Sequence, residues 1–298
     1  MALQFKAVVA SRNALQALEA AVGCGGEIHS TYRNTVNVRF PGDRLLTLHG
    51  GRKLIAPFGI ALGRRFRSPA FEHIAPGTPV EAAEGCLRVP DVGLEISAAG
   101  ARVWEPKALP TAPAPEVARV RADVLSGIVR RHDHPDGLAG LVDPADATPL
   151  LRRARASVGT LVEGLLRLEG VLLMAGAEPL LGLGPGLTPA GDDFLAGFLG
   201  MAALASPAAL TLLHDTEAAF LGLAGKQTTL LSYAFLREAI RGVLAPPVDA
   251  LAAAILQGAD AQAVARAAAE AAGLGHTSGL DTLAGMIFAL RGLGGVAA

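Results

Sequence analysis

The spacing of hydrophobic positions changes near residue 110. Before that point, short apolar runs alternate with Gly- and Pro-rich breaks, a pattern typical of strands joined by turns. Strands are predicted at residues 35–40, 45–48, 58–62, 78–83, 86–89, 94–97 and 102–105. One helix is expected at 11–21, with Leu15 and Leu18 on one face. Many short strands favour a small barrel or sandwich.

A proline-rich segment follows. Residues 105–115 contain four prolines, which fit neither a helix interior nor a central strand, so a linker is predicted there. Beyond it the apolar positions recur with a helical period at 116–131, 152–175 with a break near Gly170, 194–205, 218–242, 247–258, 261–273 and 281–290. The predicted fold is α+β: a β-rich barrel or sandwich domain at 1–110, then an all-α domain at 111–298.

Residues 182–193 (Gly-Leu-Gly-Pro-Gly-Leu-Thr-Pro-Ala-Gly-Asp-Asp) connect a glycine-rich loop to a long apolar run. Thr188 suits the N-cap of a helix, and Pro189 suits its first position. Glycines at 182, 184 and 186 permit positive φ and a close backbone approach to a ligand. Free amides at a helix start bind anions, and two carboxylates, Asp192 and Asp193, lie about one turn inside. A plain connecting turn is the alternative.

A similar pattern returns at residues 275–285 (Gly-His-Thr-Ser-Gly-Leu-Asp-Thr-Leu-Ala-Gly). Thr277 is expected to cap a second helix with its hydroxyl, and it precedes Asp281 by four positions, as Thr188 precedes Asp192. With a shift of one residue, 193–197 aligns with 281–285. If the two helix starts converge, they form one polar pocket; chance similarity in a Gly-, Ala- and Leu-rich chain is the alternative.

A third polar group is expected on a helix at 218–242. Thr228, Thr229 and Ser232 are spaced so that their hydroxyls share a face. They form either a substrate wall or bonds back to their own helix. Lys226 is the only lysine after Lys107, and is therefore a candidate counter-charge for phosphate or carboxylate.

Charge and composition narrow the class of protein. The net charge is −1, and the first 110 residues contain 13 basic and 9 acidic residues against 13 and 18 in the remainder. The sharpest basic cluster is at 64–67, without the aromatic interleaving that nucleic-acid binding favours. The uncharged stretch 194–213 is interrupted by Ser206-Pro207, which predicts a core helix ending near Ala205 and not a membrane span. Two cysteines and no signal peptide favour a cytoplasmic protein.

Covalent catalysis has no visible nucleophile. The chain contains neither a Gly-x4-Gly-Lys phosphate loop nor a Gly-x-Ser-x-Gly elbow, and no histidine neighbours either cysteine. Positioning and electrostatic stabilisation of an anion remain, with Asp192, Asp193 and Asp281 as bases, hydrogen-bond acceptors or ligands of Mg²⁺. His132-Asp-His134 is a weaker candidate metal site.

The two motifs, Gly-x-Gly-Pro-Gly-Leu-Thr-Pro-x-Gly-Asp-Asp and Gly-His-Thr-Ser-Gly-x-Asp, resemble those of the AllH family. The resemblance implies a subunit of the oxamate carbamoyltransferase assembly of allantoin and purine breakdown, which converts oxalurate and phosphate into oxamate and carbamoyl phosphate. It also implies an FdrA-like partner subunit and a further partner. It is most secure from about Val171 onward, and the N-terminal third carries no matching motif.

Two hypotheses follow: an enzyme subunit in carbamoyl transfer, with a homo-oligomer as one option, or a non-catalytic scaffold that binds a small anion. The expected catalytic residues are Asp192, Asp193 and Asp281. The expected anion-binding residues are Gly184, Gly186, Thr188, Gly191, Lys226, Thr228, Thr229, Ser232, His276, Thr277 and Ser278.

Overall fold

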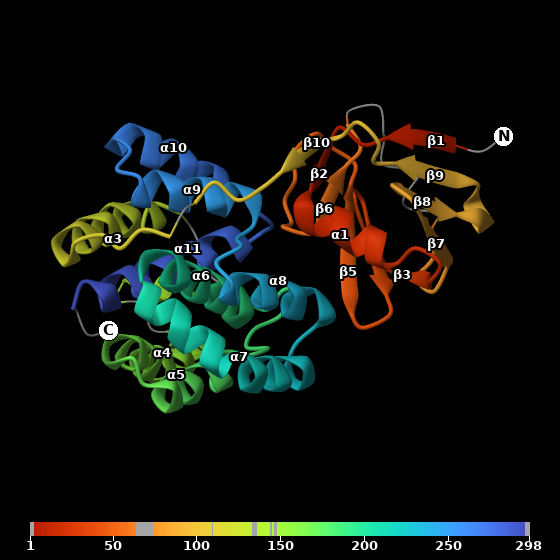
Figure 1. Ribbon diagram of the computed structural model, residues 1–298. Coiled ribbons are helices and arrows are strands. Elements are labelled where there is room, and N and C mark those ends of the chain that lie inside the picture. The colour runs from red at the N-terminus through yellow and green to blue at the C-terminus, as the bar shows by residue number, and fades with distance from the viewer. Residues whose placement is uncertain are drawn as a thin grey trace. The chain divides into compact units, whose positions relative to one another are not determined.

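The computed structural model describes residues 3–63, 74–108, 110–132, 136–143, 145 and 148–295. The chain folds into two compact units, Met1–Glu105 and Pro106–Ala298. The first consists mainly of strands and the second of helices (Figure 1), which confirms the predicted α+β fold.

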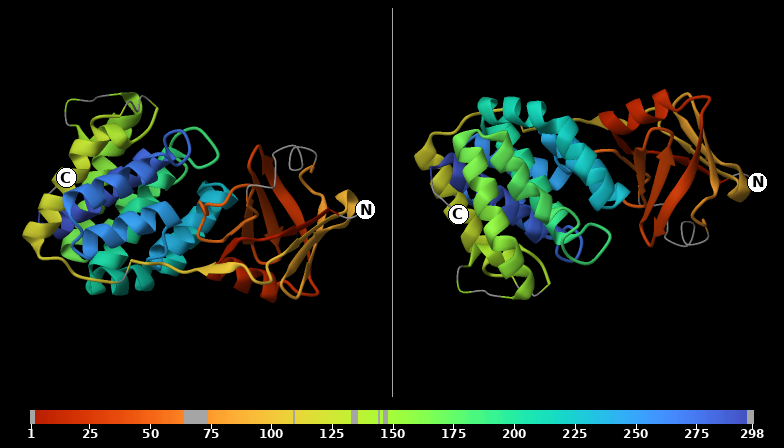
Figure 2. Two further views of the ribbon diagram at one scale, coloured as in Figure 1. Left: turned by 90° about the horizontal axis from the view of Figure 1, so that it is seen from above. Right: turned by 90° about the horizontal axis from the view of Figure 1, so that it is seen from below.

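In the described part of the first unit, ten strands form one curled sheet in the order β1-β9-β8-β7-β3-β4-β5-β6-β2-β10 (Figures 1 and 2). Their bounds are β1 Leu3–Lys6, β2 Val9–Ser11, β3 Gly25–Tyr32, β4 Thr35–Phe40, β5 Arg44–His49, β6 Gly59–Ala61, β7 Pro79–Ala83, β8 Cys86–Val89, β9 Leu94–Ser97 and β10 Arg102–Trp104. The seven predicted strands are confirmed as β4 to β10.

The sheet curls because β1 and β2 follow each other directly in the chain but pair near opposite ends of the strand order. β1 pairs in parallel with β9, and β2 pairs with β6 and β10. Between them the chain changes partner: the Ala7 amide donates to the Ser97 carbonyl and the Val8 amide to the Ala61 carbonyl, each at 2.8 Å. Ser11 is the N-cap of helix α1 (Arg12–Ala20), and its hydroxyl accepts from the Ala14 amide at 3.1 Å.

The second unit is built around two helices, α6 (Ala190–Ala205) and α11 (Ser278–Leu293), which are buried along almost their whole length. The other helices pack around this pair (Figure 1). They are α3 Pro115–Val129, α4 Pro149–Arg167, α5 Gly170–Ala177, α7 Pro207–Gln227, α8 Leu230–Ile240, α9 Pro246–Leu256 and α10 Ala261–Ala272, with short 3-10 turns η2 Ala139–Val142 and η3 Glu178–Leu180.

Glycines allow α6 and α11 to touch backbone to backbone. A Cβ on Gly197 would meet the Thr282 carbonyl oxygen, and a Cβ on Gly285 would meet the Phe194 carbonyl oxygen. The two contacts are reciprocal, because Phe194 and Gly197 of the first motif correspond to Thr282 and Gly285 of the second. The repeat seen in the sequence is therefore also a repeat in space.

Three details of the expected helices are wrong. Residues 218–242 are not one helix: α7 ends at Gln227 and α8 begins at Leu230, because Thr228 is extended and the Thr229 hydroxyl caps α8 by accepting from the Ser232 amide. Thr188 is not the N-cap and Pro189 is not the first helical residue, since Pro189 occupies the N-cap position, α6 begins at Ala190 and no side chain caps it. The Thr277 hydroxyl does not cap α11, although Thr277 occupies the N-cap position.

The proline-rich segment is attached to the helical unit. The amides of Lys107 and Ala108 donate to the buried carboxylate of Asp249 at 2.7 and 3.1 Å. Gln257 adds a bond from its side-chain amide to the Lys107 carbonyl at 2.9 Å. Asp249 is thus an anchor for this segment, a role that no sequence motif indicates.

Among the described residues, no helix is long and apolar enough for a membrane crossing. The basic cluster expected at 64–67 lies outside the described residues, as does His134 of the His-x-His sequence.

Candidate functional site at the starts of α6 and α11

The glycine-rich loop before α6 lies against the start of α11. Its backbone has positive φ at Gly182, Gly184 and Gly186, with 107° and 106° at the last two, so these turns require glycine. Residues 185–187 are exposed. The hydroxyl of Thr188 lies 3.1 Å from that of Ser278, which brings the two helix starts together as the sequence predicts.

Asp193 lies at this junction. Its Oδ2 atom is buried and has no hydrogen-bond partner among the described residues. Burial raises the pKa of Asp193 to about 8; the nearby hydroxyls of Ser278 and Thr188 oppose the shift, and the charges of Asp281 and Asp192 add to it. The side chain is therefore a protonated carboxylic acid at neutral pH, able to donate a proton.

Asp192, its neighbour, has both oxygens engaged. Oδ1 accepts from the Gly182 amide at 2.8 Å, and Oδ2 accepts a short hydrogen bond from the Thr228 hydroxyl. Burial raises its pKa, while these two contacts and the hydroxyl of Ser232 lower it. Asp192 therefore joins the glycine-rich loop to the break between α7 and α8.

Asp281 holds a different segment. Its Oδ1 accepts from the amides of Leu138 and Ala139 at 2.6 and 3.0 Å. Gly137 passes so close that an added Cβ would overlap the carboxylate. Asp281 is fully buried and acts as the acceptor for the start of η2, a contact across 143 positions that no local motif predicts.

The other expected binding residues differ in their surroundings. Thr229 joins the α8 start to the loop, since its hydroxyl donates to the Leu187 carbonyl at 2.9 Å. Gly191 is buried against the Leu180 carbonyl and its amide donates to Leu183 at 2.8 Å, so it is a packing residue. Lys226 and His276 are exposed on the loops and helix ends that flank this region.

The described residues offer little support for a metal. They contain no group of three or more His, Cys, Asp or Glu side chains arranged to hold an ion. Both oxygens of Asp192 and Oδ1 of Asp281 accept from the chain's own amides and hydroxyls instead, and Oδ2 of Asp193 is enclosed without a hydrogen-bond partner among the described residues.

The fold and site define a class of protein: a two-unit chain in which a curled sheet precedes a helical unit with a buried acid at paired helix starts. Family comparison gives the particular family. Residues 180–290 match the model described as oxamate carbamoyltransferase subunit AllH, and residues 6–103 match the AllH family N-terminal domain. The chain belongs to the AllH family. No curated protein and no solved structure matched it.

Family membership has two direct consequences. The chain is related to a subunit of a carbamoyltransferase, and a subunit acts in a complex with other subunits. Both helix starts of the site, from Gly182 to Asp193 and from Gly275 to Gly285, lie inside the matched range 180–290.

Proposed function

We propose that this chain binds the small anionic substrate of carbamoyl transfer where α6 and α11 begin, with Asp193 as the general acid. The observation that carries this proposal is the enclosed Oδ2 of Asp193, which has no hydrogen-bond partner among the described residues. A buried polar atom without a partner costs free energy, and a substrate atom that accepts its proton would remove that cost.

The raised pKa resolves an electrostatic difficulty. Three ionised aspartates would repel an anionic substrate. Because Asp193 is neutral at pH 7, it does not add to that repulsion, and it donates a hydrogen bond. The exposed loop at residues 185–187 supplies further donors for a carboxylate or phosphate through the amides of Gly186 and Leu187.

The reaction suggested by the family is the transfer of a carbamoyl group from oxalurate to phosphate. A phosphate oxygen forms a bond to the carbamoyl carbon, and the bond from that carbon to the oxamate nitrogen breaks. That nitrogen needs a proton to leave as an amide, and Asp193 supplies it, while the proton that the phosphate hydroxyl loses returns to the Asp193 carboxylate. In the reverse direction the Asp193 carboxylate takes the proton back.

Asp192 and Asp281 have supporting roles in this proposal. Their oxygens hold the glycine-rich loop and the start of η2 in place, so they position the loops around Asp193. Thr188 and Ser278 orient the acid, and Lys226 attracts the anion from the flank. A role in allantoin and purine breakdown, an FdrA-like partner and a cytoplasmic location belong to the same proposal.

A scaffold role is the second candidate, because two of the three aspartates are bonded to the chain's own amides. An assay of phosphate-dependent oxalurate cleavage distinguishes the enzyme role from the scaffold role. The assay compares this chain alone, the partner subunits alone and the reconstituted mixture. An enzyme role predicts that partners alone produce no carbamoyl phosphate; full activity without this chain would leave only the scaffold role.

A further inference from the structure

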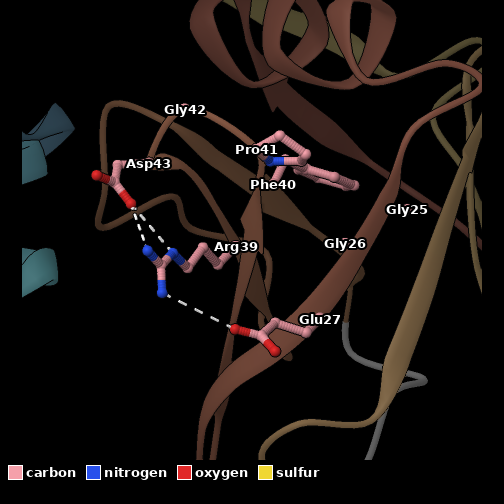
Figure 3. Close-up of a pocket in the computed structure, with 8 residues that line it drawn as sticks. All are labelled: Gly25, Gly26, Glu27, Arg39, Phe40, Pro41, Gly42 and Asp43. Atoms are coloured by element: carbon pink, nitrogen blue, oxygen red, sulfur yellow. Dashed lines mark hydrogen bonds and ion pairs between the residues drawn. The ribbon is translucent and has the colours of Figure 1, made fainter.

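Two of the cavities lined by described residues of the sheet unit differ in their charge. The first, of about 350 Å³, contains Arg39, Glu27 and Asp43 among its lining residues (Figure 3). The guanidinium of Arg39 bonds to Asp43 at 2.7 Å and lies 4.0 Å from Glu27. Two acids neutralise its one cation, so this cavity has no free positive charge for a ligand.

The second cavity, of about 550 Å³, has two cations and no acid among the described residues that line it. Its residues are Gln4, Phe5, Lys6, Val8, Arg52, Leu62 and Gly63. In the described part of the chain, neither Lys6 nor Arg52 forms an ion pair. Glu95, which lies opposite Gln4 in the sheet, is bonded to Arg88 at 2.8 Å and accepts from Gln4.

The chain brings these cations to one cavity through the ends of β1 and β6. Gln4 and Lys6 are two positions apart in β1, so their side chains lie on the same face of the strand. On the other wall, the Gly63 amide donates to the Gly51 carbonyl at 2.9 Å, which fixes the loop that carries Arg52 beside the end of β6.

The apolar residues Phe5, Val8 and Leu62 form the floor of the cavity, and Val8 among them is exposed. Gly63 has φ of +81°, and a Cβ there would come within 3.1 Å of Val8, so glycine keeps this wall thin. Leu62 is buried beside it. An apolar floor lowers the local dielectric around a bound ion, and cations at its rim then attract an anion more strongly than they would in water.

We propose that this cavity is a binding site for a small anion with a carboxylate or phosphoryl group. The planar guanidinium of Arg52 donates two parallel hydrogen bonds to one such group, and Lys6 supplies a second positive charge. The site lies in the sheet unit and is independent of the function proposed for the helical unit.

The test is calorimetric titration of the full chain with inorganic phosphate and, separately, with oxalate. Each titration is repeated in the Asp193→Asn background, so that binding at the α6–α11 site is distinguished from binding at this cavity. Loss of one charge-assisted contact costs about tenfold in Kd, so Lys6→Met with Arg52→Met should weaken binding ~100-fold. Comparing the two probes shows whether a phosphoryl or a carboxylate group is preferred.

Lys53→Met is the matched control, because Lys53 is an exposed cation of the same loop that does not line the cavity. It should change Kd by less than about twofold. All three substituted side chains are exposed, so the melting temperature should stay constant. The proposal fails if neither probe binds at millimolar concentration, if the double variant binds as the native chain does, or if Lys53→Met weakens binding as much as Arg52→Met.

Discussion

The hydroxyl of Thr188 lies 3.1 Å from the hydroxyl of Ser278, although 90 positions separate them in the sequence. This contact joins the glycine-rich loop before α6 to the first turn of α11. Asp193 lies beside both hydroxyls, so its environment depends on how α6 and α11 pack. Substitutions can test that packing and the acid separately.

Gly285→Ala should destabilise the helical unit by about 3 kcal/mol, because overpacking of a tight core contact has a cost of this order. The added methyl would overlap the Phe194 carbonyl oxygen. Helical circular dichroism during urea unfolding measures the loss. Gly222→Ala in α7 is the control: nothing lies within 4 Å of its Cβ, and it should gain up to about 1 kcal/mol. Equal effects of the two changes would refute the close crossing.

Asp281→Ala should also cost about 3 kcal/mol, since it leaves the amides of Leu138 and Ala139 without their acceptor. Asp281→Asn keeps one oxygen and should cost less. The same urea experiment measures both variants. If Asp281→Ala were as stable as the native chain, the carboxylate would not be the anchor of η2.

His49 makes the sheet unit sensitive to acid. Burial lowers its pKa from 6.5 to about 3, and neither ring nitrogen has a hydrogen-bond partner among the described residues. As pH falls, His49 is therefore protonated in the unfolded chain at a higher pH than in the folded chain. The free energy of unfolding decreases as pH falls below 6.5. The loss should reach about 2 kcal/mol at pH 5.

His49→Leu should remove that part of the pH dependence. Trp104, the only tryptophan, lies in β10, so its fluorescence reports unfolding of the sheet unit. If the native chain and His49→Leu lose the same free energy of unfolding between pH 7 and 5, groups other than His49 cause the loss.

Asp193 should have the opposite effect on the helical unit. Its folded pKa of about 8 is above the ordinary 3.8, so the folded state binds more protons between these values. Stability should fall as pH rises through that window, by up to about 1.4 kcal/mol per pH unit. Asp193→Asn should flatten the slope between pH 6 and 8. An unchanged slope would mean that Asp193 is ionised at neutral pH.

Local pattern explains what could be predicted of the fold. Period-two alternation identified β4, and caps and prolines set most helix limits within a few residues. β3 was missed because its Gly-Gly start and polar residues lack that alternation. The break at Thr228 was missed because Thr is tolerated in helices and no glycine or proline at residues 227–229 marks a helix end.

The site was predictable only in part, for a physical reason. The repeated motif indicated that two helix starts meet, and the Thr188–Ser278 contact agrees with it. Local pattern could not separate the three aspartates, since their difference lies in long-range partners. Asp281 faces residues 143 positions away, while Oδ2 of Asp193 is enclosed without a partner among the described residues.

The most direct test of the account is the turnover of Asp193→Asn in the reconstituted assembly, measured as carbamoyl phosphate formed from oxalurate and phosphate. Loss of a general acid should lower kcat by about 10²- to 10⁴-fold, with a melting temperature at neutral pH no lower than that of the native chain, because Asn does not titrate. Asp192→Asn, which disturbs a bonded neighbour, is the control and should lower stability as well as rate. Normal turnover by a folded Asp193→Asn assembly would contradict the account.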